Sequence, residues 1–166
     1  MSNPPTSTQP IFWRDSELPH IELRQVSDGR AVCYEPHSHT QWSMGAITGG
    51  QSTFEYVGRH YHVGEGSLVF MNPEWVHACN PVDNQPWAYL MLYVDAGWLA
   101  GLRFRLGLLD APLWQDIHCD VSSSAVLYSG FQALADWLQD GRVSSEQKRN
   151  DVEAFLSEVM VSISDS

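Results

Sequence analysis

The amino-acid sequence predicts a mainly β domain that ends in α-helices. One observation is the rhythm of residues 11–94, where turn-forming pairs such as Asp28-Gly29 and Asn72-Pro73 separate short runs rich in β-branched and aromatic residues. Many short strands at such intervals are typical of an antiparallel sandwich or barrel. The other observation is that apolar residues recur at intervals of three and four after residue 120, as they do in amphipathic helices.

The strands expected in the first part of the chain follow from these runs, which cover residues 21–26, 31–35, 40–48, 52–57, 67–71 and 87–94. Gly49 and Gly50 stand between two of them, and glycine readily takes the positive φ angles of a two-residue hairpin. Asp95 can cap a short helix that continues to about residue 105. Residues 112–117 are expected to form one more extended piece.

Two amphipathic helices are expected near the C-terminus. Gly141 is positioned to end the first helix in a left-handed conformation, and Ser144 with Gln147 has the spacing of a capping box for the second. A symmetric dimer is the simple way to bury the apolar stripes of these helices, and the alternative is that the two helices only bury each other. The residues expected at a dimer interface are Leu127, Phe131, Leu134, Leu138, Phe155 and Val159.

Composition limits the classes of protein to which the chain can belong. Its 166 residues suffice for one domain after a flexible leader at residues 1–10, and 43% hydrophobic residues with 17% charged ones exclude a wholly disordered chain. The longest apolar run, residues 87–94, is far shorter than the roughly 20 residues that cross a bilayer. The N-terminus lacks the features of a signal peptide, and the three cysteines form no C-x-x-C pair, so we expect a cytoplasmic protein.

The charge of the chain argues against direct contact with nucleic acid. A surface that binds phosphates needs an excess of lysine and arginine. This chain has 9 such residues against 20 aspartates and glutamates, and its net charge is −11. We therefore expect no DNA binding by these residues themselves.

Three histidines stand at positions from which they could meet. His37 and His39 are two residues apart, so on one strand they would point to the same face. His77 follows the run 67–71 after a proline turn and joins them if the two segments lie side by side in a barrel. Imidazole nitrogens suit a divalent metal such as Zn²⁺ or Ni²⁺. The alternative is that these histidines are polar wall residues of a ligand pocket.

The spacing of these histidines resembles the two motifs of the cupin barrel. In the first motif a glutamate follows His-x-His, and here that position falls on Ser43 or Met44, neither of which supplies a carboxylate. Gly66 and His77 match the spacing of the second motif. In addition, this sequence resembles the N-terminal arm of AraC/XylS-type transcription regulators in three stretches, which are HSHTQWSMGAITGG, LVFMNPEWVHACNP and WAYLMLYVDAGWL.

This resemblance implies a cupin-like barrel, a double-stranded β-helix or jelly roll, over residues 11–120 and an antiparallel α-helical hairpin over residues 121–166. In that family the barrel binds a small effector, the hairpin pairs two protomers, and a C-terminal helix-turn-helix domain, not contained in this chain, binds DNA. The chain is then a non-enzymatic sensor. The residues expected to contact the effector are His37, His39, Ser43, His77, Tyr89 and Tyr93.

Two other functions compete with this interpretation. One is a metal-dependent cupin enzyme, such as a dioxygenase or an isomerase, in which His37, His39 and His77 would hold the metal. The missing glutamate counts against it. The other is a small binding or storage cupin with no regulator attached. The shared strand face of Trp87, Tyr89, Met91 and Tyr93 fits a pocket wall and an ordinary core equally well.

Overall fold

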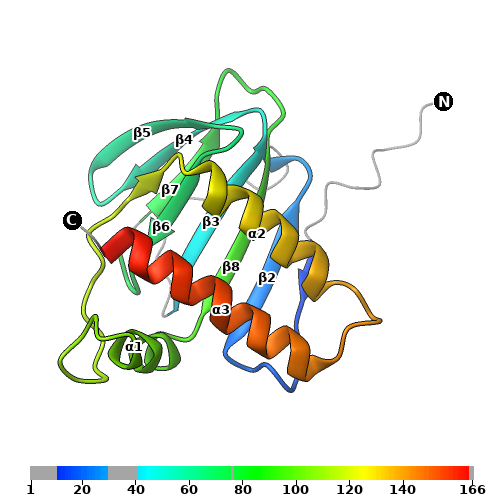
Figure 1. The fold of residues 1–166 in the computed structure, drawn as a ribbon. Coiled ribbons are helices and arrows are strands. Elements are labelled where there is room, and N and C mark those ends of the chain that lie inside the picture. The colour runs from blue at the N-terminus through cyan, green and yellow to red at the C-terminus, as the bar shows by residue number, and fades with distance from the viewer. Residues whose placement is uncertain (1–10, 30–40, 76, 165–166) are drawn as a thin grey trace.

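The described part of the chain folds into two antiparallel β-sheets and three α-helices (Figure 1). The computed structural model describes residues 11–29, 41–75 and 77–164. The larger sheet has the strand order β1-β2-β8-β3-β6-β9 and the smaller sheet the order β5-β4-β7. The strands of the larger sheet are β1 (Ile11–Trp13), β2 (Ile21–Val26), β3 (Trp42–Gly49), β6 (Leu68–Met71), β8 (Ala88–Val94) and β9 (Val121–Ser122). Those of the smaller sheet are β4 (Gln51–Tyr56), β5 (Arg59–Gly64) and β7 (His77–Pro81).

Strand β3 lies inside the larger sheet, paired with β8 on one side and β6 on the other. Successive residues of a strand point to opposite faces, so β3 serves two cores. Trp42, Met44 and Ala46 belong to the core on the helix side, while Ile47 packs with residues of the smaller sheet. Both faces of β3 are therefore covered, and the strand is buried along most of its length.

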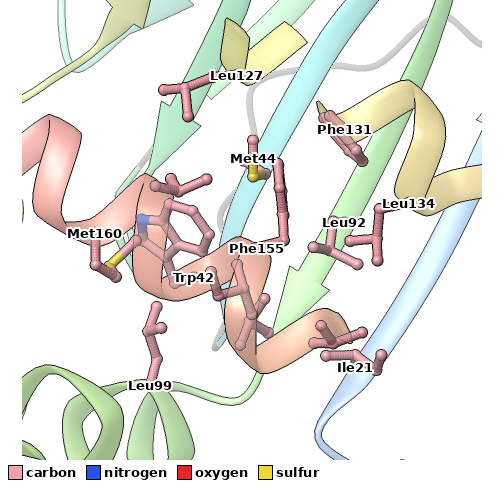
Figure 2. Close-up of a cluster of buried hydrophobic side chains, with 14 of the residues drawn as sticks. Ile21, Trp42, Met44, Leu92, Leu99, Leu127, Phe131, Leu134, Phe155 and Met160 are labelled. Atoms are coloured by element: carbon pink, nitrogen blue, oxygen red, sulfur yellow. The ribbon is translucent and has the colours of Figure 1, made fainter. Parts of the chain in front are cut away.

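Three helices follow the strands: α1 (Ala96–Arg105), α2 (Ala125–Leu138) and α3 (Ser145–Ser164). Helices α2 and α3 cross the outer face of the larger sheet and run in opposite directions (Figure 1). Figure 2 shows the core between them and the sheet, where Phe131 of α2 and Phe155 of α3 approach the sheet residues Trp42 and Leu92. The two phenylalanine rings lie 6.0 Å apart. None of the helices described is long and apolar enough to cross a membrane.

Side-chain caps mark where the three helices begin, and the sequence predicted those of α1 and α3. The Asp95 carboxylate accepts a hydrogen bond of 2.8 Å from the backbone N–H of Trp98, so the expected start of α1 is confirmed. Ser144 accepts a bond of 3.1 Å from the N–H of Gln147, which is half of the expected capping box. The Gln147 side chain bonds to Asp151, one turn further along α3, rather than back to Ser144. Such i, i+4 pairs compete with the second half of a capping box.

The overall class of fold is confirmed, and five of the expected strands lie within two residues of their predicted bounds. The expected hairpin at Gly49 and Gly50 is wrong, because β3 and β4 belong to different sheets. Gly50 has a φ angle of +68° and turns the chain at this corner, where a Cβ atom would lie 2.2 Å from the carbonyl oxygen of Pro86. Glycine is needed there for a close approach of two backbones, which dipeptide rules do not anticipate.

Three further expectations have different outcomes. The predicted extended piece at residues 112–117 forms no strand, and β9 follows it instead. Gly141 does not cap α2, because the helix ends at Leu138 and Gln139 keeps a right-handed conformation. The strand expected at residues 31–35 lies outside the described residues.

The structure places the six residues expected at a dimer interface inside the chain. They pack against the larger sheet and against one another, and none is more than 8% exposed: Leu127, Phe131, Leu134, Leu138, Phe155 and Val159. The reason is that the outer face of the larger sheet also carries large apolar side chains, and the apolar stripes of the two helices pack against these side chains and bury them. A dimer contact through these helices would have to use their exposed apolar side chains, which are Val126, Trp137 and Val161.

Candidate functional site

A hollow lies inside the barrel, between the larger sheet and β7. About 450 Å³ of space, its mouth included, is free of atoms, and a water-sized molecule can place its centre in about 30 Å³ of it. Ligand sites in proteins usually measure about 300–1,000 Å³. By the measure of the space open to a water-sized molecule, the hollow is much narrower than such sites, so a larger ligand could enter only if lining side chains moved. The residues that line it are Gly45, Ile47, Val69, Met71, His77, Cys79, Trp87, Tyr89, Met91 and Tyr93.

The alternation of side chains along three neighbouring strands builds this wall. Gly45 and Ile47 come from β3, Val69 and Met71 from β6, and Tyr89, Met91 and Tyr93 from β8, each two residues apart. A Cβ atom on Gly45 would lie 3.0 Å from both the Met91 methyl group and a methyl group of Val69. Because Gly45 has no side chain, the side chains of Met91 and Val69 from the two neighbouring strands can meet over the middle of β3.

Three of the six predicted effector contacts, His77, Tyr89 and Tyr93, line the hollow. Ser43 is fully buried and, by alternation, points to the same side of β3 as Gly45. His37 and His39 lie outside the described residues. Sequence reasoning missed most of the apolar lining from β3 and β6, because a buried strand shows no alternation of polar and apolar residues to reveal its inner face.

The His77 ring has a defined orientation. Its Nδ1 lies 3.1 Å from the carbonyl oxygen of Trp75, and the side chain is 5% exposed. Because a carbonyl oxygen only accepts, Nδ1 is the donor, and in the neutral ring Nε2 is then the basic nitrogen. Histidines that bind metals often have this arrangement.

The metal site expected from the sequence stays a prediction. Within the described ranges no three His, Cys, Asp or Glu side chains come together as metal ligands, but His37 and His39 are not among these residues. The structure does bear on the glutamate of the first cupin motif. Met44 points to the helix side of the sheet, and Ser43 offers only a hydroxyl group. Neither position supplies a carboxylate to the hollow.

Cys79 lies two residues after His77 on β7 and lines the same hollow. Burial raises the pKa of the Cys79 thiol to about 12. Cys79 is half-buried, and a neutral thiol in such a place behaves as a small apolar side chain rather than as a nucleophile.

We therefore expect Cys79 to react slowly with alkylating reagents. At pH 8 a thiol of pKa about 12 is ionised to roughly one part in 10⁴, against about a quarter for an ordinary thiol. In a Cys33→Ser, Cys119→Ser variant, iodoacetamide should modify Cys79 at least ~100-fold more slowly in the folded protein than in urea. Equal rates in the two states would show that the fold does not shield the thiol or raise its pKa.

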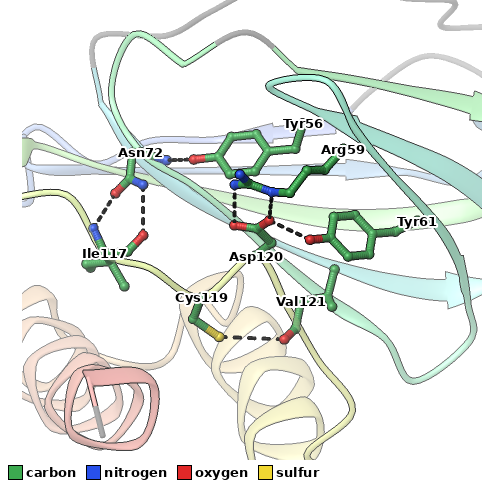
Figure 3. A network of polar contacts seen from close by, with 8 residues as sticks. All are labelled: Tyr56, Arg59, Tyr61, Asn72, Ile117, Cys119, Asp120 and Val121. Atoms are coloured by element: carbon green, nitrogen blue, oxygen red, sulfur yellow. Dashed lines mark hydrogen bonds and ion pairs between the residues drawn. The ribbon is translucent and has the colours of Figure 1, made fainter. Parts of the chain in front are cut away.

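A connecting segment, residues 106–120, joins α1 to β9 and is hydrogen-bonded to residues of the two sheets and of the β6–β7 turn (Figure 3). Asn72 follows β6 directly, and its buried side chain makes two hydrogen bonds with the backbone of Ile117. The amide nitrogen donates to the carbonyl oxygen over 2.8 Å, and the amide oxygen accepts from the N–H over 2.7 Å. The N–H of Asn72 donates to the Tyr56 hydroxyl oxygen over 2.7 Å. Burial raises the pKa of Tyr56 to about 12, so the phenol stays neutral.

Two carboxylates of the connecting segment accept hydrogen bonds from side chains, most of which belong to the sheets or to the β6–β7 turn. Asp116 accepts hydrogen bonds from the indole N–H groups of Trp75, at 3.2 Å, and Trp114, at 2.9 Å. Asp120 accepts two from Arg59, at 2.6 and 3.1 Å, and one from the Tyr61 hydroxyl, at 2.6 Å. The segment that leads into α2 is therefore attached to the turn between β6 and β7 and to the hairpin of β4 and β5.

Comparison with known proteins identifies the family. The family model for the AraC-like ligand-binding domain matches residues 22–161, which is most of the chain. The chain belongs to this family. A search of curated protein sequences gave no significant match.

The chain is also similar to solved structures, to different degrees. Apo ToxT from Vibrio cholerae, crystallised as a point variant, superimposes with a TM-score of 0.59 at 10% sequence identity, over 87% of this chain and 55% of the ToxT chain. This chain thus spans about half the length of ToxT. A cupin protein from Bacteroides fragilis has a TM-score of 0.48 and 18% identity, over 58% of this chain and 85% of that protein.

Proposed function

We propose that the chain is the effector-sensing domain of an AraC-type transcription regulator and has no catalytic activity. The observation that carries the proposal is the family match over residues 22–161, together with the hollow at the centre of the matched region. A small molecule bound in the hollow would stabilise one conformation of the barrel over another. Such differential affinity is what allows a ligand to shift a conformational equilibrium.

The attachment of the connecting segment supports a route from the hollow to the helices. Met71 and His77 line the hollow at the two ends of the β6–β7 turn. The same turn holds residues 116 and 117 through Trp75 and Asn72. Ser124, which caps α2, follows closely, so a displacement of the turn would pass to the start of that helix.

The proposal includes pairing of two protomers in the cytoplasm and DNA binding through a domain outside this chain. The exposed face of α2 supports the pairing, because Val126 is 69% and Trp137 39% exposed. Beside Trp137, a groove lies between α2 and α3, with Gly130 and Phe155 among the residues that line it. Exposed apolar side chains next to such a groove are typical of protein–protein contacts.

A thermal-shift screen of small metabolites tests the sensing role. We expect at least one compound to stabilise the protein, by about 2.7 kcal/mol at a hundredfold excess over its Kd. In a domain of this size that free energy corresponds to roughly 5–10 °C in Tm. Gly45→Val adds bulk at the middle of the hollow and should abolish the shift, with Cys79→Leu as a second filling variant and Asp136→Ala as the surface control. A broad screen without any hit, or hits that persist in both filling variants, would refute the proposal.

Sedimentation over a range of protein concentrations tests the pairing. Wild-type protein should sediment increasingly as a dimer as its concentration rises. A Val126→Asp, Trp137→Asp variant should remain a monomer with an unchanged circular dichroism spectrum, because both side chains are exposed. Gln132→Asp, on an exposed turn of the same helix, adds charge without removing apolar surface. A wild-type protein that stays monomeric at high micromolar concentration would contradict the pairing but not the sensing role.

A further inference from the structure

The chemistry of the hollow identifies the class of effector, on the premise that the proposed sensing function holds. We propose that the ligand is a small, uncharged, largely apolar ring compound with a single hydrogen-bonding group, which Ser43 binds. Three features of the hollow support this inference. They are its lining, one buried hydroxyl group and one movable methionine.

The described lining selects for an apolar ring. It contains the stacked pair Trp87 and Tyr89, whose ring centroids lie 4.8 Å apart, and the two methionines Met71 and Met91. None of the lining residues identified in the described part is an acid, a lysine or an arginine. A sugar or an amino acid would lose many hydrogen bonds to water on entering such a site, and unpaired polar groups are costly to bury. Aromatic and thioether side chains favour flat apolar ligands.

Ser43 supplies the one polar handle that we assign to the site. Its side chain is fully buried, and its Oγ atom has no hydrogen-bond partner. In the sheet it stands in register between Met71 of β6 and Tyr93 of β8, both of which line the hollow. A buried hydroxyl group without a partner is destabilising, and a ligand that bonds to it recovers that free energy.

A second buried donor near the hollow points elsewhere. The indole Nε1 of Trp87 also lacks a partner. A Cβ atom built on Gly29 would lie 2.5 Å from this nitrogen, so that edge of the indole faces the turn at residues 28–29. Trp87 therefore offers its ring face rather than its N–H group, so of these two buried groups without a partner Ser43 is the one placed to bond a ligand.

Met91 limits the size of the ligand. Its Sδ and Cε atoms would lie 3.2 and 3.0 Å from a Cβ atom on Gly45, so the side chain lies directly over that glycine and fills the centre of the hollow. Methionine is unbranched and adapts its conformation easily. A water-sized molecule can place its centre in only about 30 Å³ of the hollow as it stands, so moving this one side chain is what makes room for a single ring.

Calorimetric titration of the intact chain with four probes tests the proposal. Phenol has the proposed chemistry, toluene lacks the hydroxyl group, benzoate adds a charge, and glucose is polar throughout. We expect phenol to bind wild-type protein about three- to tenfold more tightly than toluene, the worth of one net hydrogen bond. Benzoate and glucose should bind more weakly than either.

The variant Ser43→Ala isolates the hydrogen bond. It should bind toluene as wild-type protein does and lose the preference for phenol. Because it removes a buried hydroxyl group without a partner, its Tm should equal or exceed that of wild-type protein. Met91→Ala is the second variant, and it should bind phenol and toluene more tightly, since no side chain then has to move.

The outcomes separate this inference from the proposed function. A preference for phenol that survives in Ser43→Ala would overturn the role of Ser43. Tighter binding of glucose or benzoate than of phenol, lost in the filling variant Gly45→Val, would overturn the ligand class but leave the sensing function intact. No binding of any probe, together with a broad metabolite screen without hits, would overturn both.

Discussion

Replacing Asn72 by alanine is expected to destabilise the fold by roughly 2–5 kcal/mol. The side chain is 3% exposed and acts as a short piece of backbone, pairing with both the N–H and the carbonyl group of Ile117. Its removal leaves these two groups without their partner, and each buried unpaired group costs about 1–3 kcal/mol. That loss is a large part of the 5–15 kcal/mol by which a typical domain is stable.

Urea denaturation of Asn72→Ala measures this effect. Asn80→Ala is the control, because Asn80 lies on the next strand, β7, and is only partly buried. We expect the control to change the free energy of unfolding by no more than about 1 kcal/mol. A loss of that small size in Asn72→Ala as well would mean that the connecting segment is not fastened to the barrel through this residue.

Replacing Phe131 by alanine is expected to cost about 3–5 kcal/mol of stability, the usual range for a fully buried phenylalanine. The side chain is 0% exposed and packs between the larger sheet and Phe155 of α3. This prediction also separates the two roles considered for the residue. A core residue stabilises each chain by itself, whereas an interface residue acts only when two chains meet.

The free energy of unfolding of Phe131→Ala should therefore fall by the same amount at low and high protein concentration. Asp136→Ala, at an exposed position of the same helix, should lie within about 0.5 kcal/mol of wild-type protein. A Phe131→Ala loss that vanishes in dilute protein would place the residue at a dimer interface, as its spacing in the sequence first indicated.

Much of the fold could be predicted from local patterns in the sequence. β-branched runs located β2, β3, β4, β6 and β8, and the apolar periodicity located α2 and α3. Sheet membership could not be read in this way, because it depends on contacts between distant residues. Gly49-Gly50 has the composition of a hairpin, yet the neighbouring Pro86 backbone decides that the chain crosses between sheets there. The helical stripes were recognised correctly as apolar, but only the sheet beneath them determines what covers them.

The candidate site was predictable where a residue stood in a recognisable motif. His77, Tyr89 and Tyr93, three of the residues expected to contact an effector, line the hollow, and their contact with an effector stays a prediction. The packing over β3 was not predictable, because the place that a side chain of Gly45 would take is occupied by Met91 and Val69 from the two neighbouring strands. The hydrogen bonds between Asn72 and Ile117 could not be predicted either. The two residues are 45 positions apart, and backbone groups are the same at every position, so no sequence pattern marks them as partners.

The central claim is that a ligand bound in the hollow changes the stability of the connecting segment and of the start of α2. Hydrogen exchange with and without bound ligand tests this claim most directly. The ligand would be the compound with the largest shift in the thermal screen. The account predicts slower exchange in β6, in the turn at residues 72–75, in residues 114–122 and in the first turn of α2. Slower exchange confined to the strands that line the hollow, with α2 unchanged, would contradict it.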